Sequence, residues 1–166
     1  MTGALANLRQ AAVELLNENG IRAVAAFEAE GRKKWAGPVV AVSLARVVCA
    51  PGGFKDYLGT RRDEATGEEE ELYGRGVEVT LSLDVYGPRD GGESACREVL
   101  DEMAELLTSQ SVAGVSVREL ESGQAEFLDG CGLYRLPVRC VCRAWLTAAV
   151  REDGEFVDFL VKGRRA

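Results

Sequence analysis

The sequence contains no histidine among its 166 residues. This absence excludes Ser-His-Asp and Cys-His nucleophiles, histidine-ligated zinc and haem, and imidazole acid-base catalysis. No apolar run approaches the roughly 18 residues of a membrane span, and no hydrophobic N-terminal segment precedes a cleavage site. We therefore expect a protein with no catalytic residues, no cofactor and no membrane contact, which is intracellular when made and carries no export signal.

The composition is that of one folded domain covering residues 1–166. Hydrophobic residues make up 46% of the chain and charged residues 28%, which is enough apolar material to bury a core. The net charge of −7 argues against a general nucleic-acid binder. Residues 63–105 hold 14 acidic and three basic side chains. Such an uneven electrostatic field suits a molecule that orients itself against a partner or another copy. A solvated face plus an acidic loop would give the same distribution of charge.

The five cysteines are an odd number, which fits a reducing cytosol better than a disulfide scaffold. Cys140 and Cys142, with Cys131 upstream, could be taken for zinc ligands, but the first two alternate with apolar residues as on one side of a strand. We predict that they are buried thiols, and that Cys131, between two glycines, is the exposed cysteine. The sequence predicts no metal site.

Two glycine-containing motifs resemble phosphate loops only superficially. Gly74-Arg-Gly76 opens a strand, and Gly91-Gly92-Glu93 precedes a helix without the Lys followed by Ser or Thr that a P-loop needs. An acidic residue in the first helical turn would also repel phosphate. We expect a helix cap here and no phosphate site.

Two amphipathic helices are predicted. In the first, which Thr2 can cap and Gly20 ends, one apolar face combines Leu5, Leu8, Ala12, Leu15 and Leu16. In the second, one stripe combines Cys96, Val99, Leu100, Met103, Leu106 and Leu107.

Strand patterns occupy most of the remaining chain. Residues 77–85 alternate apolar and polar side chains without a break, which is the clearest strand signal. The nearly uncharged run 38–49 predicts a central strand covered on both faces. Residues 112–120 and 124–129 predict a hairpin around Glu121-Ser122-Gly123, and 133–150 and 156–161 predict a long and a final strand.

Residues 54–74 are predicted to form a long loop or arm, because they are polar and irregular and include four consecutive glutamates. The whole pattern indicates an α+β domain, with a mainly antiparallel sheet packed against two helices. An extended 73–87 segment would span about 50 Å, well beyond a usual strand of about 17–20 Å. We therefore expect a long projecting strand or hairpin whose unpaired backbone groups meet a neighbouring subunit.

Three arginines, Arg135, Arg139 and Arg143, recur every four residues along a strand pattern and so share one face. They could pair with the acidic run Glu68, Glu69, Glu70 and Glu71 of another copy, lie on a solvated sheet face, or contact phosphate. Pro137 in the same run cannot donate to a ladder, so it indicates an edge or a bulge. The acidic run and the three arginines are the candidate oligomer interface.

The stretch 76–88, Gly-Val-Glu-Val-Thr-Leu-Ser-Leu-Asp-Val-Tyr-Gly-Pro, and the following 93–107, Glu-Ser-Ala-Cys-Arg-Glu-Val-Leu-Asp-Glu-Met-Ala-Glu-Leu-Leu, resemble the strand-to-helix core of phage tail terminator (tail completion) proteins. The late segment Gly132-Leu-Tyr-Arg-Leu-Pro-Val-Arg-Cys-Val-Cys-Arg-Ala resembles the long late strand of that family. The order of elements is similar over most of the chain. The arm at 54–73 has no counterpart that we can match.

The resemblance implies a non-enzymatic subunit of a ring, usually a hexamer, at the head-proximal end of a phage tail, assembled in the bacterial cytoplasm. The implied partners are further copies of the chain, the tail tube protein, a head-tail connector or neck protein, and a sheath protein in a contractile tail. DNA would pass through without specific binding. Two alternatives remain: a small α+β module that binds a ligand or peptide, and another tail or baseplate component.

Overall fold

The computed structural model describes residues 4–26, 36–51, 57–151 and 156–162. These residues form two helices and one nine-stranded sheet, which is antiparallel except where β1 pairs with β2. In chain order the elements are α1 (Ala4–Glu18), β1 (Ala23–Ala25), β2 (Val39–Pro51), β3 (Tyr57–Arg62), β4 (Glu69–Gly87), α2 (Gly92–Ser109), β5 (Val117–Ser122), β6 (Glu126–Leu128), β7 (Leu133–Leu136), β8 (Val138–Arg151) and β9 (Phe156–Lys162). The prediction of an α+β domain with a mainly antiparallel sheet and two helices is confirmed.

Strand β4 is the spine of the sheet. Its 19 residues pair on one side with β2 and then β3, and on the other side with β7 and then β8. The alternation predicted from the sequence is present, because Val77, Val79, Leu81, Leu83 and Val85 are all buried. Polar side chains of β4 therefore lie on the opposite face of the sheet.

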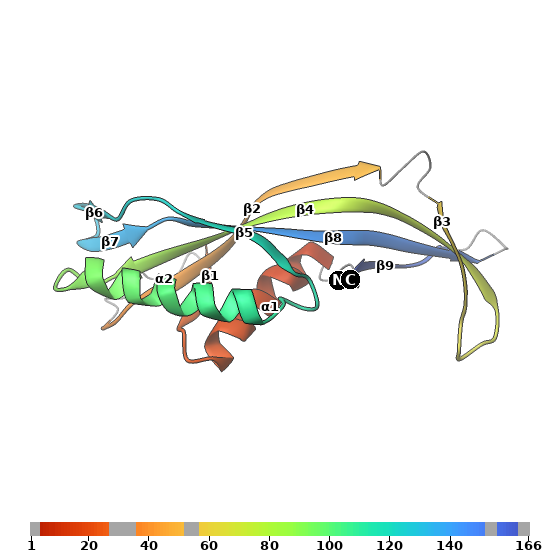
Figure 1. Ribbon diagram of the computed structural model, residues 1–166, viewed down its shortest axis with the longest axis horizontal. Helices are drawn as coiled ribbons and strands as arrows, with labels where there is room; N and C mark the ends of the chain where they lie inside the picture. Colours follow the sequence, from red (N-terminus) through yellow and green to blue (C-terminus); the bar gives the residue numbers. More distant parts are fainter. Residues whose placement is uncertain (1–3, 27–35, 52–56, 152–155, 163–166) are drawn as a thin grey trace.

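Both helices lie on the same side of the sheet, beneath one half of it, and leave the other half uncovered (Figure 1). Their apolar stripes meet the buried side chains of the sheet, with Leu8 and Leu16 from α1 and Cys96 and Met103 from α2 in the core. Gly20 follows α1 with φ +81°, as expected of a residue that ends a helix. The cap predicted at Thr2 lies outside the described residues.

The 54–74 segment is not the irregular loop that its composition suggests. Its described part forms the hairpin β3–β4, with Tyr57 opposite Tyr73 and Arg62 opposite Glu69. The hairpin extends beyond the helices and curls at the far end of the sheet, so it is an arm (Figure 1). Local composition hides these strands because the arm packs on no core and needs no apolar alternation.

Gly74 allows the arm to pack on itself. A Cβ at this position would lie 2.5 Å from Cδ1 of Leu58 and 3.2 Å from the carbonyl oxygen of Leu146. A side chain at this position would displace Leu58 and crowd the backbone of β8.

The predicted hairpin between 112–120 and 124–129 is wrong. β5 pairs with β8, and β6 pairs with β7, so the two segments join different strands. The chain does turn at the predicted residues, where the Gly123 N–H donates to the carbonyl of Pro137, 2.9 Å away. After this turn, however, the chain pairs with β7 and does not return along β5. Pro137 separates β7 from β8, in agreement with the predicted interruption.

The prediction that 38–49 is a central strand covered on both faces is correct only for its first part. Val39, Val40 and Val42 are buried, and β1 pairs with residues 40–42 of β2. Beyond these residues no described strand pairs with the outer side of β2, and Leu44 and Val48 are exposed. An uncharged β-branched run is compatible with a buried strand and also with an edge that meets a partner.

Candidate interaction surface

The face of the sheet that the helices leave free carries the predicted arginine row. Each of the three arginines has an acidic partner in its own chain, which favours the solvated-face interpretation for the isolated chain. Arg139 lies 2.8 Å from Glu121 and 3.5 Å from Glu119, and Arg143 lies 3.6 Å from Glu78. Intersubunit pairing through this row stays a prediction.

Arg135 makes the best defined of these ion pairs. Its Nε and Nη2 atoms donate to Oδ2 of Asp84 at 3.1 and 2.8 Å, and Nη1 lies 3.3 Å from Glu126. Asp84 also accepts a hydrogen bond from Ser82. The hydrogen bond to Asp84 raises the pKa of Arg135 above its usual value. Arg135 is therefore part of a fixed network within the chain.

The acidic run Glu68–Glu71 lies on the arm, at the start of β4, whereas the arginine row lies on β7 and β8. Glu68, Glu69 and Glu71 are exposed, but Glu70 is buried and pairs with Arg61 of β3. Glu71 accepts a hydrogen bond from the Tyr73 hydroxyl at 2.7 Å, and this bond raises the pKa of Tyr73. Glu70 is thus a buried member of the arm and is not presented to another copy.

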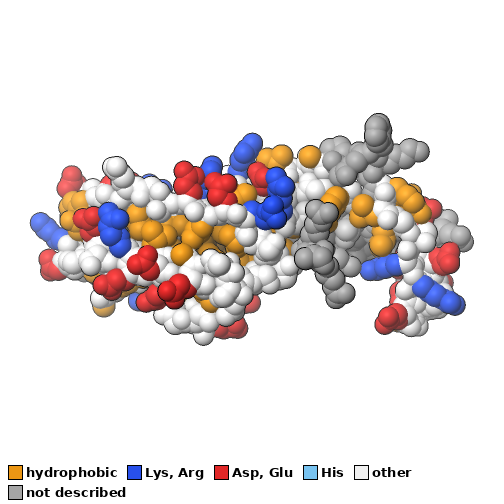
Figure 2. All heavy atoms as spheres, viewed as in Figure 1, with side chains coloured by type: hydrophobic (Ala, Val, Ile, Leu, Met, Phe, Trp, Pro, Cys, Tyr) orange, Lys and Arg blue, Asp and Glu red, His pale blue; other side chains and the backbone are white. Residues whose placement is uncertain are grey.

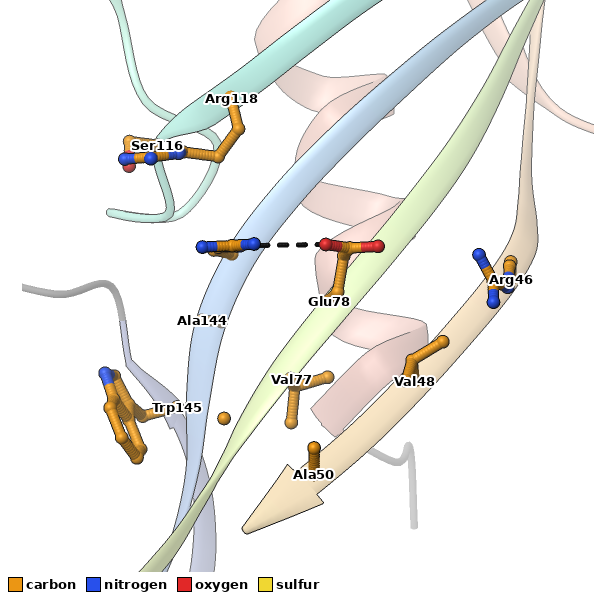
Figure 3. A pocket seen from close by; sticks show the side chains of 11 residues that line it. Arg46, Val48, Ala50, Val77, Glu78, Ser116, Arg118, Ala144 and Trp145 are labelled. Carbon is orange, nitrogen blue, oxygen red and sulfur yellow. Dashed lines mark ion pairs between the residues drawn. The ribbon is translucent and has the colours of Figure 1, made fainter. Parts of the chain in front are cut away.

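A hollow of about 390 Å³ opens on the helix-free face (Figure 3). Its side chains come from β2, β4, β5 and β8, and the register explains why they meet. Val48 is opposite Glu78, and Glu78 is opposite Arg143, so the three share one face. Arg46, Arg118 and Trp145 complete the polar and aromatic lining.

The hollow holds three guanidinium groups and one carboxylate. Glu78 lies 3.6 Å from Arg143, which is a long contact, and the two side chains are 36% and 66% exposed. Within the part of the chain that the structure describes, Arg46 and Arg118 form no ion pair and no side-chain hydrogen bond. The hollow is a local cationic site on a chain of net charge −7.

Sequence reasoning predicted only Arg143 among the basic residues of this site. The β8 alternation does place Trp145 on the face of Arg143, but Arg46 and Arg118 come from β2 and β5. Their approach depends on the pairing of β2 and β5 to either side of the β4–β8 pair, which no local pattern encodes.

One edge of the sheet concentrates exposed apolar side chains. Among the described residues, five large hydrophobic side chains are exposed, and four of them, Leu44, Val48, Tyr57 and Leu58, lie on β2 and β3. Both strands pair with β4 on the same side, so these residues follow one continuous margin, which we call the β2–β3 edge. Hydrophobic side chains reach the surface near the base of the arm in Figure 2.

The β2–β3 edge also has backbone groups available for pairing. No described strand covers the outer side of β3 or the second half of β2. Irregular pairing at Leu44/Arg46 and at Tyr57/Gly59 interrupts the two strands, as is common at exposed edges. An edge of this length and apolarity is a template for a further strand.

The cysteines are all free thiols. Cys140 and Cys142 are buried with their sulfur atoms 3.8 Å apart, as predicted for a core position. Their mutual hydrogen bond and burial raise the pKa of Cys140 well above the usual thiol range. The exposed cysteine is Cys49 on β2, whereas Cys131 is half-buried, so the prediction that Cys131 is the exposed thiol is wrong.

The described residues contain no cluster of three or more acidic, cysteine or histidine side chains arranged to hold a metal ion. At the start of α2, Glu93 is paired with Arg97 at 3.1 Å, and Gly91 has φ +68°. None of the helices in the described ranges combines the length and apolarity needed to cross a membrane.

Comparisons with known proteins give little beyond this geometry. No family model and no curated protein matches the chain. Among solved structures, a chain from the virion of a native gene transfer agent particle is similar, with 13% sequence identity and a TM-score of 0.33. The match covers 86% of this chain and 92% of that chain. A TM-score of this size does not establish a shared fold.

Proposed function

We propose that the chain is a structural subunit of a self-assembling particle, and that it joins further copies of itself through the β2–β3 edge. The observation that carries this proposal concerns the described residues. Four of their five exposed large hydrophobic side chains lie on the β2–β3 edge, which no described strand covers beyond β1. Contiguous exposed apolar surface is uncommon on monomeric proteins and marks interaction sites. Backbone hydrogen bonds at such an edge give the affinity for an added strand, and the exposed side chains determine how that strand is aligned.

The finer proposal follows the sequence resemblance to phage tail terminators. Subunits would form a ring, usually a hexamer in that family, at the head-proximal end of a phage tail. The ring would end the growth of the tail tube and join it to a connector or neck protein, and to the sheath where the tail is contractile. A net charge of −7 suits a ring through which DNA passes without sticking.

We also propose that the protein is not an enzyme. The absence of histidine supports this part of the proposal, since it removes the commonest acid-base and nucleophile-activating side chain. A subunit that acts by strand pairing with its neighbours needs no catalytic group. The proposed location is the virion tail, after assembly in the host cytoplasm.

Sedimentation velocity and electron microscopy of the purified chain test the proposal. We expect a concentration-dependent oligomer, visible as rings with an open lumen. Val48→Lys should shift the chain toward monomer, because a charge on an apolar edge opposes strand addition. Phe127→Lys is the matched control, because Phe127 is also 36% exposed but lies on β6. A strict monomer at all concentrations and salts would overturn the proposal.

A second function is favoured by the hollow on the helix-free face. A cationic, aromatic-lined hollow of about 390 Å³ is large enough to hold a small anionic ligand or an acidic peptide. A thermal-shift screen against small anions distinguishes the two functions. Stabilisation of a monomer that forms no rings would favour the binding module.

A further inference from the structure

We infer that the hollow is a receptor for the acidic arm tip, residues 63–71, of a second copy of the chain. The inference rests on the proposed function, because it names a contact between assembled subunits. It differs from pairing through the arginine row, since Arg135 and Arg139 already have partners in their own chain.

The charge of the hollow calls for an anionic occupant. Arg46 and Arg118 lack a partner among the described residues, and the contact of Arg143 with Glu78 is long, so guanidinium groups outnumber carboxylates by two. Guanidinium groups bind carboxylates through paired hydrogen bonds, and the contact strengthens when the occupant excludes water. Trp145 offers an apolar surface beside them for the stems of glutamate side chains.

The arm tip has the complementary charge and a fixed shape. Four exposed acidic side chains lie in residues 63–71, namely Glu64, Glu68, Glu69 and Glu71, beside the half-buried Asp63. The Asp63 carboxylate accepts hydrogen bonds from the N–H groups of Ala65 and Thr66, and the Gly67 N–H donates to the Asp63 carbonyl at 2.8 Å. A turn ordered in this way loses little conformational entropy when it binds.

The tip cannot occupy the hollow of its own chain. Glu69 and Glu78 lie on the same strand, nine residues and about 30 Å apart. This part of β4 is held between β3 and β2 on one side and β8 on the other, so it cannot fold back. The arm also projects beyond the helices, where another subunit can meet it (Figure 1). The occupant is therefore the tip of a neighbouring copy.

Charge reversal tests this contact. Arg118→Glu and Glu69→Arg should each weaken self-association by at least about tenfold in sedimentation velocity, and the double variant should recover part of the loss. Raising NaCl from about 0.05 to 0.5 M should weaken the wild type and leave the single variants less affected. Arg97→Glu and Glu98→Arg on α2 are the matched controls and should leave association unchanged.

The outcomes separate this inference from the function on which it rests. If Leu44→Lys, on the β2–β3 edge and outside the hollow, dissociates the oligomer while Arg118→Glu and Glu69→Arg do not, the inference is wrong and the edge proposal stands. If Arg118→Glu instead abolishes binding of short single-stranded DNA without changing association, the hollow is a phosphate site and the inference is again wrong. A wild type that stays monomeric overturns both.

Discussion

The carboxylate of Glu70, with only 1% of its side chain exposed, lies 2.8 Å from Nη2 of Arg61 across the β3–β4 hairpin. Arg61 Nε donates to the same oxygen at 2.9 Å, so the guanidinium group holds the carboxylate with two hydrogen bonds. A buried charge is tolerated only with such a partner. This pair fixes β3 on β4 where the helices no longer support the sheet.

Replacement of Arg61 should therefore loosen the arm without unfolding the domain. For Arg61→Ala we expect faster amide hydrogen exchange over residues 57–74, equivalent to a local loss of about 1–3 kcal/mol. The midpoint of global unfolding should hardly move, because the arm lies outside the core. Arg62→Ala is the control, because Arg62 is exposed and its partner among the described residues is the Gly67 carbonyl in the turn. Equal exchange in the two variants would contradict the prediction.

The ion pairs of the arginine row should differ in strength. Arg135→Ala removes two hydrogen bonds from Asp84, which is only 15% exposed, and should cost about 1–3 kcal/mol in urea unfolding. Arg139→Ala should cost less than about 1 kcal/mol, because Arg139 and its two glutamates are each more than half exposed. Salt at 0.5 M should reduce the second loss more than the first. A larger effect at Arg139 would refute this ranking.

The elements that face the core could be predicted from the sequence, and those beyond it could not. The apolar residues of 77–85 are buried as expected, and so is the stripe from Cys96 to Leu107 apart from the half-buried Leu100, since each pattern is imposed by one apolar layer. β3 has exposed residues with no such layer to face, and its pairing with β4 follows from the turn at 63–68. The assignment of β5 to β8 is a matter of tertiary register, for which local sequence carries no signal.

The candidate site was predictable to a similar extent. The strand period correctly placed Arg139 and Arg143 on one face, but it gave no sign that their partners are Glu121 and Glu78. The β2–β3 edge was missed because the run 38–49 has the composition of a buried strand. An edge strand differs from a central strand in lacking a pairing strand on one side, and the sequence of β2 does not show whether such a strand is present.

Gly87 and Gly92 lie so close together that a side chain at Gly87 should destabilise the fold. A Cβ on Gly87 would lie 2.5 Å from the Gly92 carbonyl oxygen and 2.8 Å from Sγ of Cys96. The clash involves backbone, so β4 and α2 would have to separate, and Gly87→Ala should cost about 1–3 kcal/mol in chemical unfolding. Gly130→Ala, where no atom lies within 4 Å of the added carbon, should be nearly neutral. Equal stability of the two variants would show that this junction can adapt.

Burial of thiols should make the fold less stable at alkaline pH. Burial, and to a smaller extent Glu93, raise the pKa of Cys96 above that of an unfolded thiol. Below about pH 8.5 both states are protonated and the stability is fully present. At higher pH the unfolded thiol loses its proton first, so the free energy of unfolding falls by up to about 1.4 kcal/mol per pH unit.

Urea unfolding between about pH 7 and 10 measures this loss, with Cys96→Ala against Cys131→Ala as the comparison. The slope of stability against pH should become shallower in Cys96→Ala, whatever its stability at pH 7. Cys131→Ala is the cysteine control, because it removes a half-buried thiol and leaves Cys96 in place. Parallel curves for all three proteins would mean that Cys96 does not ionise differently in the two states.

Cys49 should report directly on the β2–β3 edge. It is exposed on β2, one residue after Val48, so a neighbouring subunit that adds to this edge must shield its thiol. Alkylation by iodoacetamide, followed by mass spectrometry, should therefore slow as the protein concentration rises into the range of assembly. Cys131 serves as an internal reference, because it follows β6 and lies away from this edge.

The symmetry of the assembly makes protection a better readout than cross-linking between two Cys49 residues. A closed ring larger than a dimer uses a heterologous contact, in which the edge of one subunit meets a different surface of the next. Cys49 residues would then be shielded without meeting each other. Val48→Lys should restore rapid alkylation at every concentration. If Cys49 reacts equally fast in monomer and oligomer, the subunits join elsewhere and the β2–β3 edge has another role.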